Sequence, residues 1–258
     1  MTTLVRETPS DGVVLLRLNR PERLNALNEE LVGELQQTFA SLAADLGVRV
    51  VILTGTGRGF CSGIDVRDFG PGMLDASDPA IERMRFQEKM AALPNAVRAL
   101  PQPVIAAVNG PAVGGGMALC LASDVRICSA SASFANAAIL LGLSGAEMGM
   151  SYYLPRIVGL SVAADWMLTG RRIPAEEALQ RGLVSELVDD EHLLDRAIER
   201  ASEIAVLSPL AVQMTKRTLQ VNTDASGLSA AVELENRNQV ITHATQEAAD
   251  ARERWAAR

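Results

Sequence analysis

The sequence is poor in aromatic residues, cysteines and histidines. Aromatic residues occupy 3% of the 258 positions and the net charge is −7. Both features disfavour nucleic acid as a partner, because single strands stack on aromatic rings and the backbone attracts basic surfaces. The three cysteines have no CxxC spacing, which argues against a disulfide framework and fits a reducing compartment. Two histidines offer too few converging ligands, so we expect no metal site.

Long apolar runs are also missing. No run reaches the roughly 18–20 residues that a membrane-spanning helix needs, and Asp124 and Arg126 interrupt the apolar stretch "CLASDVRICS". The first residues, "MTTLVRETPSDGVVLLRLNRP", contain no basic segment followed by an apolar stretch, which a secretory signal would require. We therefore expect a cytoplasmic protein without a membrane partner.

The sequence does contain apolar strands that alternate with helical patterns. Asn28 is the expected N-cap of a helix in which Leu31, Leu35, Phe39 and Leu42 recur at helical spacing. The expected strands are 12–18, 48–54, 103–108 and 125–128, and the expected helices are 80–100, from about 115, 156–168, 174–181, 190–206 and 208–257. This order predicts an α/β fold with a largely parallel sheet and a helical C-terminal region.

Two glycine-rich segments follow expected strands. They read "GFCSGIDV" at 59–66 and "NGPAVGGGMAL" at 109–119. Neither matches a Walker A loop or G-x-G-x-x-G, which disfavours a nucleotide phosphate loop. Each segment is either a tight structural turn or a place where backbone N–H groups at a helix start can hold an oxyanion. Two such turns above one sheet could aim two donors at a single point.

These segments belong to a longer ordered set of motifs. The others are "LNRPERLNALN" at 18–28, "PVIAAVNGPAVGGGMALCLASDVRICSASASF" at 103–134 and "LPRIVGLSVAADWMLTGRRIPAEEALQRGLVSELV" at 154–188. Together with "GRGFCSGIDV" they resemble the crotonase (enoyl-CoA hydratase/isomerase) superfamily across most of the chain, and the last 50 residues match loosely.

The resemblance implies a fold, a substrate class and an assembly. It implies a crotonase-like spiral of ββα units, with an acyl-CoA-binding core at 1–200 and a C-terminal helical trimerisation region at 201–258. It implies a homotrimer or a dimer of trimers. The implied partner is an acyl-CoA thioester, so that coenzyme A arrives with the substrate and no cofactor is bound permanently.

The resemblance also implies functional residues. The N–H groups of Ser62 and Gly115 would polarise the thioester carbonyl. A channel for the acyl-CoA would be lined by Ser62, Gly63, Ile64 and Asp65, and the adenine and pantetheine end would lie near Arg23, Leu24 and Ala26.

The sequence departs from the family's hydratases at two positions. Those enzymes carry two glutamates, and the matching residues here are Ala118 and Ala138. Hydration needs a base for the water and an acid for the proton, and alanine supplies neither. Glu147, which is the single charged residue between Arg126 and Arg156, matches the place where dienoyl-CoA isomerases and 4-chlorobenzoyl-CoA dehalogenases carry an aspartate.

Several interpretations follow from this departure. Glu147 could move a proton in an isomerase, could serve alone in a hydratase with an ordered water, or could merely cap a helix that begins near Met148. If it has no catalytic role, the chain could be a CoA-thioester binder that does not hydrate. Cys61 is expected to be a buried thiol rather than a nucleophile, and Asp65 is expected to fix its loop.

Overall fold

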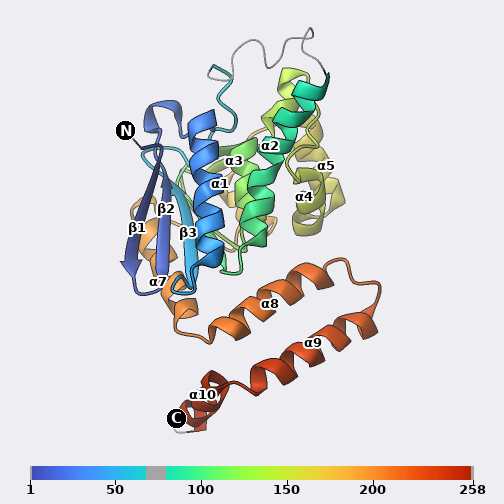
Figure 1. Cartoon of the computed structure of the whole chain (residues 1–258). Helices are drawn as coiled ribbons and strands as arrows, with labels where there is room; N and C mark the ends of the chain where they lie inside the picture. Colours follow the sequence, from blue (N-terminus) through green and yellow to red (C-terminus); the bar gives the residue numbers. More distant parts are fainter. Residues whose placement is uncertain (1, 68–79, 257–258) are drawn as a thin grey trace.

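The chain forms a mixed α/β structure built on a six-stranded sheet (Figure 1). The computed structural model describes residues 2–67 and 80–256. The strand order is β1-β2-β3-β4-β6-β9, in which β1 is antiparallel to β2 and the remaining neighbours are parallel. The strands are β1 (Leu4–Ser10), β2 (Val13–Leu18), β3 (Val50–Gly55), β4 (Val104–Val108), β6 (Val125–Ser129) and β9 (Glu186–Val188).

A second sheet of three very short strands flanks the first. It has the order β5-β7-β8. Its members are β5 (Pro111–Val113), β7 (Ser133–Ala135) and β8 (Ile173–Pro174). Because β5 leads directly into the glycine turn at 114–116, this sheet fixes where the turn lies.

One face of the main sheet is covered by α1 (Glu29–Ala44), α2 (Ala80–Ala99) and α3 (Gly115–Ala122). The predicted cap of α1 is confirmed, since the Asn28 side chain accepts a hydrogen bond from the N–H of Leu31. The expected stripe of Leu31, Leu35, Phe39 and Leu42 is buried. The apolar face of α1 therefore packs into the larger of the two hydrophobic clusters.

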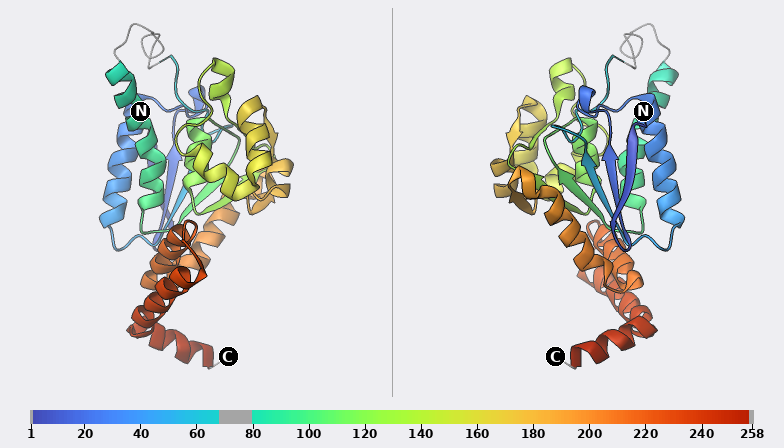
Figure 2. Two further views of the ribbon diagram at one scale, coloured as in Figure 1. Left: turned by 90° about the vertical axis from the view of Figure 1, so that its right-hand side faces the viewer. Right: turned by 90° about the vertical axis from the view of Figure 1, so that its left-hand side faces the viewer.

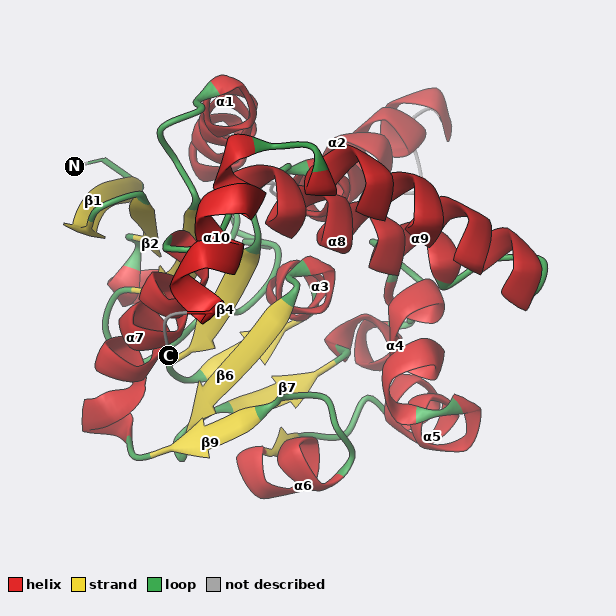
Figure 3. Cartoon of the chain, turned by 90° about the horizontal axis from the view of Figure 1, so that it is seen from below, coloured by secondary structure: helices red, strands yellow, loops and turns green. Residues whose placement is uncertain are grey.

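The opposite face of the main sheet is covered by α7 (Leu193–Ala205) (Figure 3). Successive strand residues alternate between the two faces, as the pleat requires. In β2, for example, Val13 and Leu15 pack toward α7, whereas Val14 and Leu16 join the cluster with α1, α2 and α3. A sheet covered on both faces explains why its strands read as continuous apolar runs.

Two helical predictions need correction. The predicted helix 156–168 is two helices, α4 (Met150–Val158) and α5 (Leu160–Thr169), because Gly159 adopts a positive φ of 83° between them. The predicted helical stretch 208–257 is divided into α8 (Pro209–Asn222), α9 (Leu228–His243) and α10 (Gln246–Ala256). The remaining short helices in the described part of the chain are η1 (Pro21–Arg23), η3 (Ala137–Leu141), α6 (Ala175–Gln180) and η4 (Asp190–His192).

The last three helices form an arm that extends away from the two sheets (Figure 2). A cavity of about 680 Å³ lies between α8, α9 and α10 and the end of α7, and its wall is mostly apolar. Across the described ranges 2–67 and 80–256, no helix combines the length and the apolar character needed to cross a membrane.

Candidate active site

Two loops that the sequence assigned to substrate binding lie side by side. Leu27 donates its N–H to the carbonyl of Gly63 at 2.7 Å, and its own carbonyl accepts the N–H of Asp65 at 2.9 Å. The Ser62 hydroxyl donates to the carbonyl of Arg23 at 3.2 Å. The structure therefore brings the segment 23–27 next to the segment 62–65.

Buried polar side chains hold these loops in place. Asp65 accepts the N–H of Arg67 at 3.2 Å and forms an ion pair with Arg20, with Nη1 and Oδ2 2.9 Å apart. The loop-fixing role predicted for Asp65 is confirmed. The sequence did not single out Asn25, which is fully buried, has a positive φ of 56° and donates to the carbonyls of Thr56 and Gly59.

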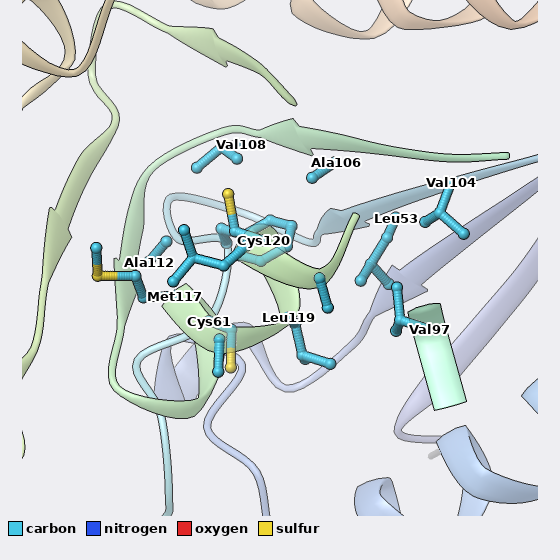
Figure 4. Packing of buried hydrophobic residues seen from close by; sticks show 14 of the residues in the cluster. Leu53, Cys61, Val97, Val104, Ala106, Val108, Ala112, Met117, Leu119 and Cys120 are labelled. Atoms are coloured by element: carbon cyan, nitrogen blue, oxygen red, sulfur yellow. The ribbon is translucent and has the colours of Figure 1, made fainter. Parts of the chain in front are cut away.

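The segment around Cys61 packs between β5 and α3. Cys61 donates its N–H to the carbonyl of Pro111 and accepts the N–H of Val113 at 2.9 Å. Figure 4 shows Cys61, Ala112 and Met117 in the same buried cluster. Burial raises the pKa of the Cys61 thiol to about 12. Since the thiolate is the nucleophile, the prediction of an inert buried thiol is favoured.

The start of α3 provides a backbone donor close to this loop. A Cβ atom built on Gly63 would lie 3.4 Å from the nitrogen of Gly115, so the two glycines face each other. Within the described residues, the N–H of Gly115 has no hydrogen-bond partner. Open N–H groups at a helix N-terminus carry partial positive charge and attract anionic oxygens.

The other expected donor is engaged in this structure. The N–H of Ser62 donates to the carbonyl of Leu24 at 3.0 Å. Leu24 has a positive φ of 49°, which places it and Asn25 in consecutive left-handed conformations. The N–H of Ser62 is therefore not open in the way that the Gly115 N–H is.

Glu147 lies against the glycine turn. A Cβ atom built on Gly114 would be 4.0 Å from its Oε1. The carboxylate is half-buried, and among the described residues no hydrogen bond or ion pair reaches it. Burial raises the pKa of Glu147 above its usual value. An unpaired carboxylate with a raised pKa beside an oxyanion donor is a combination typical of acid–base sites.

The interpretation of Glu147 as a helix cap is wrong. Helix α4 begins at Met150, and Gly149 is its N-cap residue without a side-chain capping bond. Glu147 contributes to the turn through its backbone, where its carbonyl accepts the N–H of Met150 at 2.8 Å. Its carboxylate is therefore not used for helix capping.

The two alanines that replace the family's glutamates are buried. Ala118 is 0% exposed in α3 and Ala138 is 7% exposed in η3, so neither position brings a polar group to the site. Tyr152 and Tyr153 pack edge to face, with the guanidinium of Arg98 over both rings. This arrangement favours a packing role for the two tyrosines over a role in binding an acyl group.

Known proteins share this sequence and this fold. A profile of the enoyl-CoA hydratase/isomerase family matches residues 8–257. A Mycobacterium leprae protein described as a probable enoyl-CoA hydratase, EchA12, is 43% identical over 239 residues, which cover 92% of this chain and 81% of that protein. Human mitochondrial Δ(3,5)-Δ(2,4)-dienoyl-CoA isomerase is 36% identical over 225 residues, which cover 83% of this chain and 67% of that enzyme.

A solved structure agrees over nearly the whole chain. The crystal structure of an enoyl-CoA hydratase from Bacillus anthracis superposes with a TM-score of 0.92 at 32% identity, covering 99% of this chain and 96% of that chain. The chain belongs to the enoyl-CoA hydratase/isomerase family.

Proposed function

We propose that this enzyme is an isomerase-type member of the family, which moves a proton on an enoyl-CoA thioester. The observation that carries the proposal is the position of Glu147. Its unpaired carboxylate lies beside the glycine turn at 114–116, in which the N–H of Gly115 is open. The absence of a glutamate at 118 and 138 supports isomerisation over hydration.

The proposed reaction begins with the thioester carbonyl oxygen at the Gly115 N–H. Glu147 removes a proton from the α-carbon, and the C–H electron pair becomes the enolate double bond while negative charge collects on the oxygen. The same carboxyl group then returns the proton at the γ-carbon and restores the thioester. A preset donor at about 2.7–3.1 Å from the oxyanion stabilises such an enolate by a few kcal/mol.

Ser62 has a conditional role in this proposal. Its N–H would become the second donor when the thioester oxygen shares it with, or replaces, the carbonyl of Leu24. Arg23, Leu24 and Ala26 would contact the coenzyme A portion, and the segment Ser62–Asp65, through Gly63 and Ile64, would line the channel. Coenzyme A would arrive as part of the substrate, with no other cofactor needed.

The test is an exchange and isomerisation assay of Glu147→Gln. Wild-type enzyme should remove deuterium from the α-carbon of labelled 3-enoyl-CoA, delivering it to the γ-carbon of the 2-enoyl-CoA product or losing it to solvent by exchange. Glu147→Gln should lose both deuterium removal and isomerisation by at least about 100-fold, which is the range of general acid–base catalysis. Glu191→Gln, which removes an 82% exposed carboxylate, is the matched control. Full turnover by Glu147→Gln on every substrate processed would contradict the proposal.

A second candidate is an enoyl-CoA hydratase in which Glu147 acts alone on an ordered water. The hydratase names of the relatives favour it. Hydration of crotonyl-CoA that disappears in Glu147→Gln, without α-deuterium loss from 3-enoyl-CoA, would select this function. Tight acyl-CoA binding without turnover in any assay would identify a non-hydrating CoA-thioester binder instead.

We further propose that the arm formed by α8, α9 and α10 builds a homotrimer or a dimer of trimers. Large apolar side chains on the arm are exposed, including Leu228 at 81%, Val240 at 72% and Trp255 at 76%. Exposed apolar residues concentrated on one projecting element are typical of an assembly surface. In this scheme 1–200 is the acyl-CoA-binding core and 201–258 the assembly region, which sedimentation of the full chain and of Val240→Glu would test.

A further inference from the structure

The position of the Glu147 carboxylate depends on the segment that carries it. The carboxylate has no hydrogen-bond partner among the described residues, so no side chain orients it. Catalytic groups are normally held by hydrogen bonds from neighbouring side chains. In this site, the position of the carboxylate depends on the contacts that fix the residues on either side of it.

On the C-terminal side, Met148 provides the anchor. It is 5% exposed and adopts a positive φ of 47°, which is uncommon for a residue other than glycine. A Cβ atom built on Gly115 would lie 3.4 Å from the Met148 sulfur. The turn after Glu147 therefore packs against Gly115, whose N–H is the proposed oxyanion donor.

On the N-terminal side, the anchor is a side chain from another element. Asn136 lies between β7 and η3, is fully buried, and donates from Nδ2 to the carbonyl of Gly145 at 2.5 Å. Gly145 fits closely, since a Cβ atom there would be 3.0 Å from Asn136 Nδ2 and 3.0 Å from the carbonyl oxygen of Met167 in α5. This hydrogen bond fixes the backbone two residues before Glu147.

The amide oxygen of the same side chain is the second feature of interest. Asn136 Oδ1 is buried without a hydrogen-bond partner within the residues that the structure describes. A buried polar atom of this kind costs free energy, so the amide is a poor choice for stability alone. What the amide does supply is a donor for the Gly145 carbonyl.

We infer that Asn136 is a positioning residue for Glu147, acting through the Gly145 carbonyl to hold the carboxylate over the glycine turn. The inference rests on the proposed function, in which Glu147 moves the proton. A displacement of about 1 Å at a reacting group can lower a rate by about 100-fold. Loss of the anchor should therefore reduce the chemical step and leave coenzyme A binding largely intact.

The experiment compares Asn136→Ala with Gln102→Ala in the full-length enzyme. Gln102 is a matched control, because it is 2% exposed, donates from Nε2 to the carbonyl of Leu42 at 2.7 Å, and also has a buried side-chain oxygen without a partner. It lies outside the site, where it joins the start of β4 to the end of α1. Thermal unfolding of both variants sets an assay temperature at which each is folded.

Asn136→Ala should lower kcat for the isomerisation of 3-enoyl-CoA by about 10- to 100-fold with little change in KM. It should also shift the acidic limb of the kcat–pH profile to lower pH, because a loosened segment admits water to Glu147 and lets its raised pKa fall. Gly145→Ala, which crowds the same contact from the other side, should show both changes. Gln102→Ala should show neither.

The inference is overturned if Asn136→Ala keeps the wild-type kcat or the wild-type acidic limb, or if Gln102→Ala reproduces both changes. The Glu147→Gln variant separates this failure from that of the proposed function. If Glu147→Gln is fully active, the proposed function is wrong. If Glu147→Gln is inactive while Asn136→Ala matches wild type, the positioning role alone is wrong.

Discussion

Nη1 of Arg20 and Oδ2 of Asp65 lie 2.9 Å apart, in an ion pair whose side chains are 10% and 6% exposed. Arg20 also donates to the carbonyl of Ala26. The pair thus joins the segment before η1 to the loop at 61–65. Because both charges are largely out of water, their attraction offsets part of the cost of burying them.

Replacing one partner of this pair should destabilise the enzyme strongly. Asp65→Asn removes a buried carboxylate that lies 2.9 Å from the Arg20 guanidinium, and losing one partner of a buried pair costs up to about 3–5 kcal/mol. Chemical denaturation at constant pH measures the free energy of unfolding. Glu7→Gln, which breaks the exposed pair between Glu7 and Arg17, should cost less than about 1 kcal/mol. Equal effects of the two variants would show that the buried pair has no special role.

Glu147 should make the protein less stable at neutral pH than a neutral residue would. Its pKa is raised by burial, so the folded state binds a proton more tightly than the unfolded state does. Stability is then highest below the usual glutamate pKa and falls as pH rises through the higher folded pKa. Glu147→Gln should unfold at a higher temperature than wild type at pH 7–8, with a difference that shrinks toward pH 4.5.

The measurement is a series of thermal unfolding curves for both proteins across that pH range. Glu191→Gln, at an exposed position, should follow wild type throughout. A Glu147→Gln variant that is less stable than wild type at pH 7 would show that the carboxylate has a favourable partner in solution. It would thereby remove one argument for its role in proton transfer.

The last position of the glycine turn, Gly116, should tolerate no side chain. A Cβ atom there would be 2.1 Å from the carbonyl oxygen of Cys61, which is backbone and cannot move aside. Gly116→Ala should lose more than about 3 kcal/mol of stability or fail to fold. Gly33→Ala in α1, where a Cβ atom meets nothing within 4 Å, should instead gain about 0.5–1 kcal/mol. A folded Gly116→Ala of wild-type stability would contradict the packing described for α3 and Cys61.

Four strands of the main sheet, β2, β3, β4 and β6, could be predicted from the sequence because burial on both faces leaves continuous apolar runs. Strand β1 could not, because it lies at the edge of the sheet and most of its residues are exposed. The strands expected at 48–54 and 103–108 differ from β3 and β4 by one or two residues. The second sheet could not be predicted in this way. Its strands are two or three residues long, which is too short for an alternating pattern to emerge.

The site was predictable to the extent that its residues are unusual in the sequence itself. Glu147 stands alone among uncharged residues, and three successive glycines mark the turn at 114–116. The anchoring roles of Asn25 and Asn136 leave no such mark, since each depends on backbone carbonyls brought close by folding. Asn136 reaches a carbonyl nine residues away, and Asn25 reaches one 34 residues away.

The arm should depend on a buried lysine for its attachment. Nζ of Lys216 in α8 lies 2.7 Å from Oδ2 of Asp124 and donates to the carbonyl of Gln102 at 2.9 Å. The same Asp124 oxygen accepts the N–H of Val104, which is the first residue of β4. The pair of Lys216 and Asp124 therefore joins the arm to the start of β4. Lys216→Met should cost about 2 kcal/mol, the scale of hydrogen bonds to charged groups.

Loss of this attachment should affect the arm before the sheets. Limited proteolysis of Lys216→Met should cut earlier than in wild type between α8 and α9, at residues 223–227, because few contacts then hold the arm. Lys89→Met is the control, since its 2.8 Å pair with Glu29 lies at the surface, where such pairs contribute little. If the proposed trimer forms through the arm, sedimentation should show subunit dissociation of Lys216→Met at protein concentrations at which Lys89→Met stays assembled. An unchanged cleavage rate would mean that apolar contacts alone hold the arm.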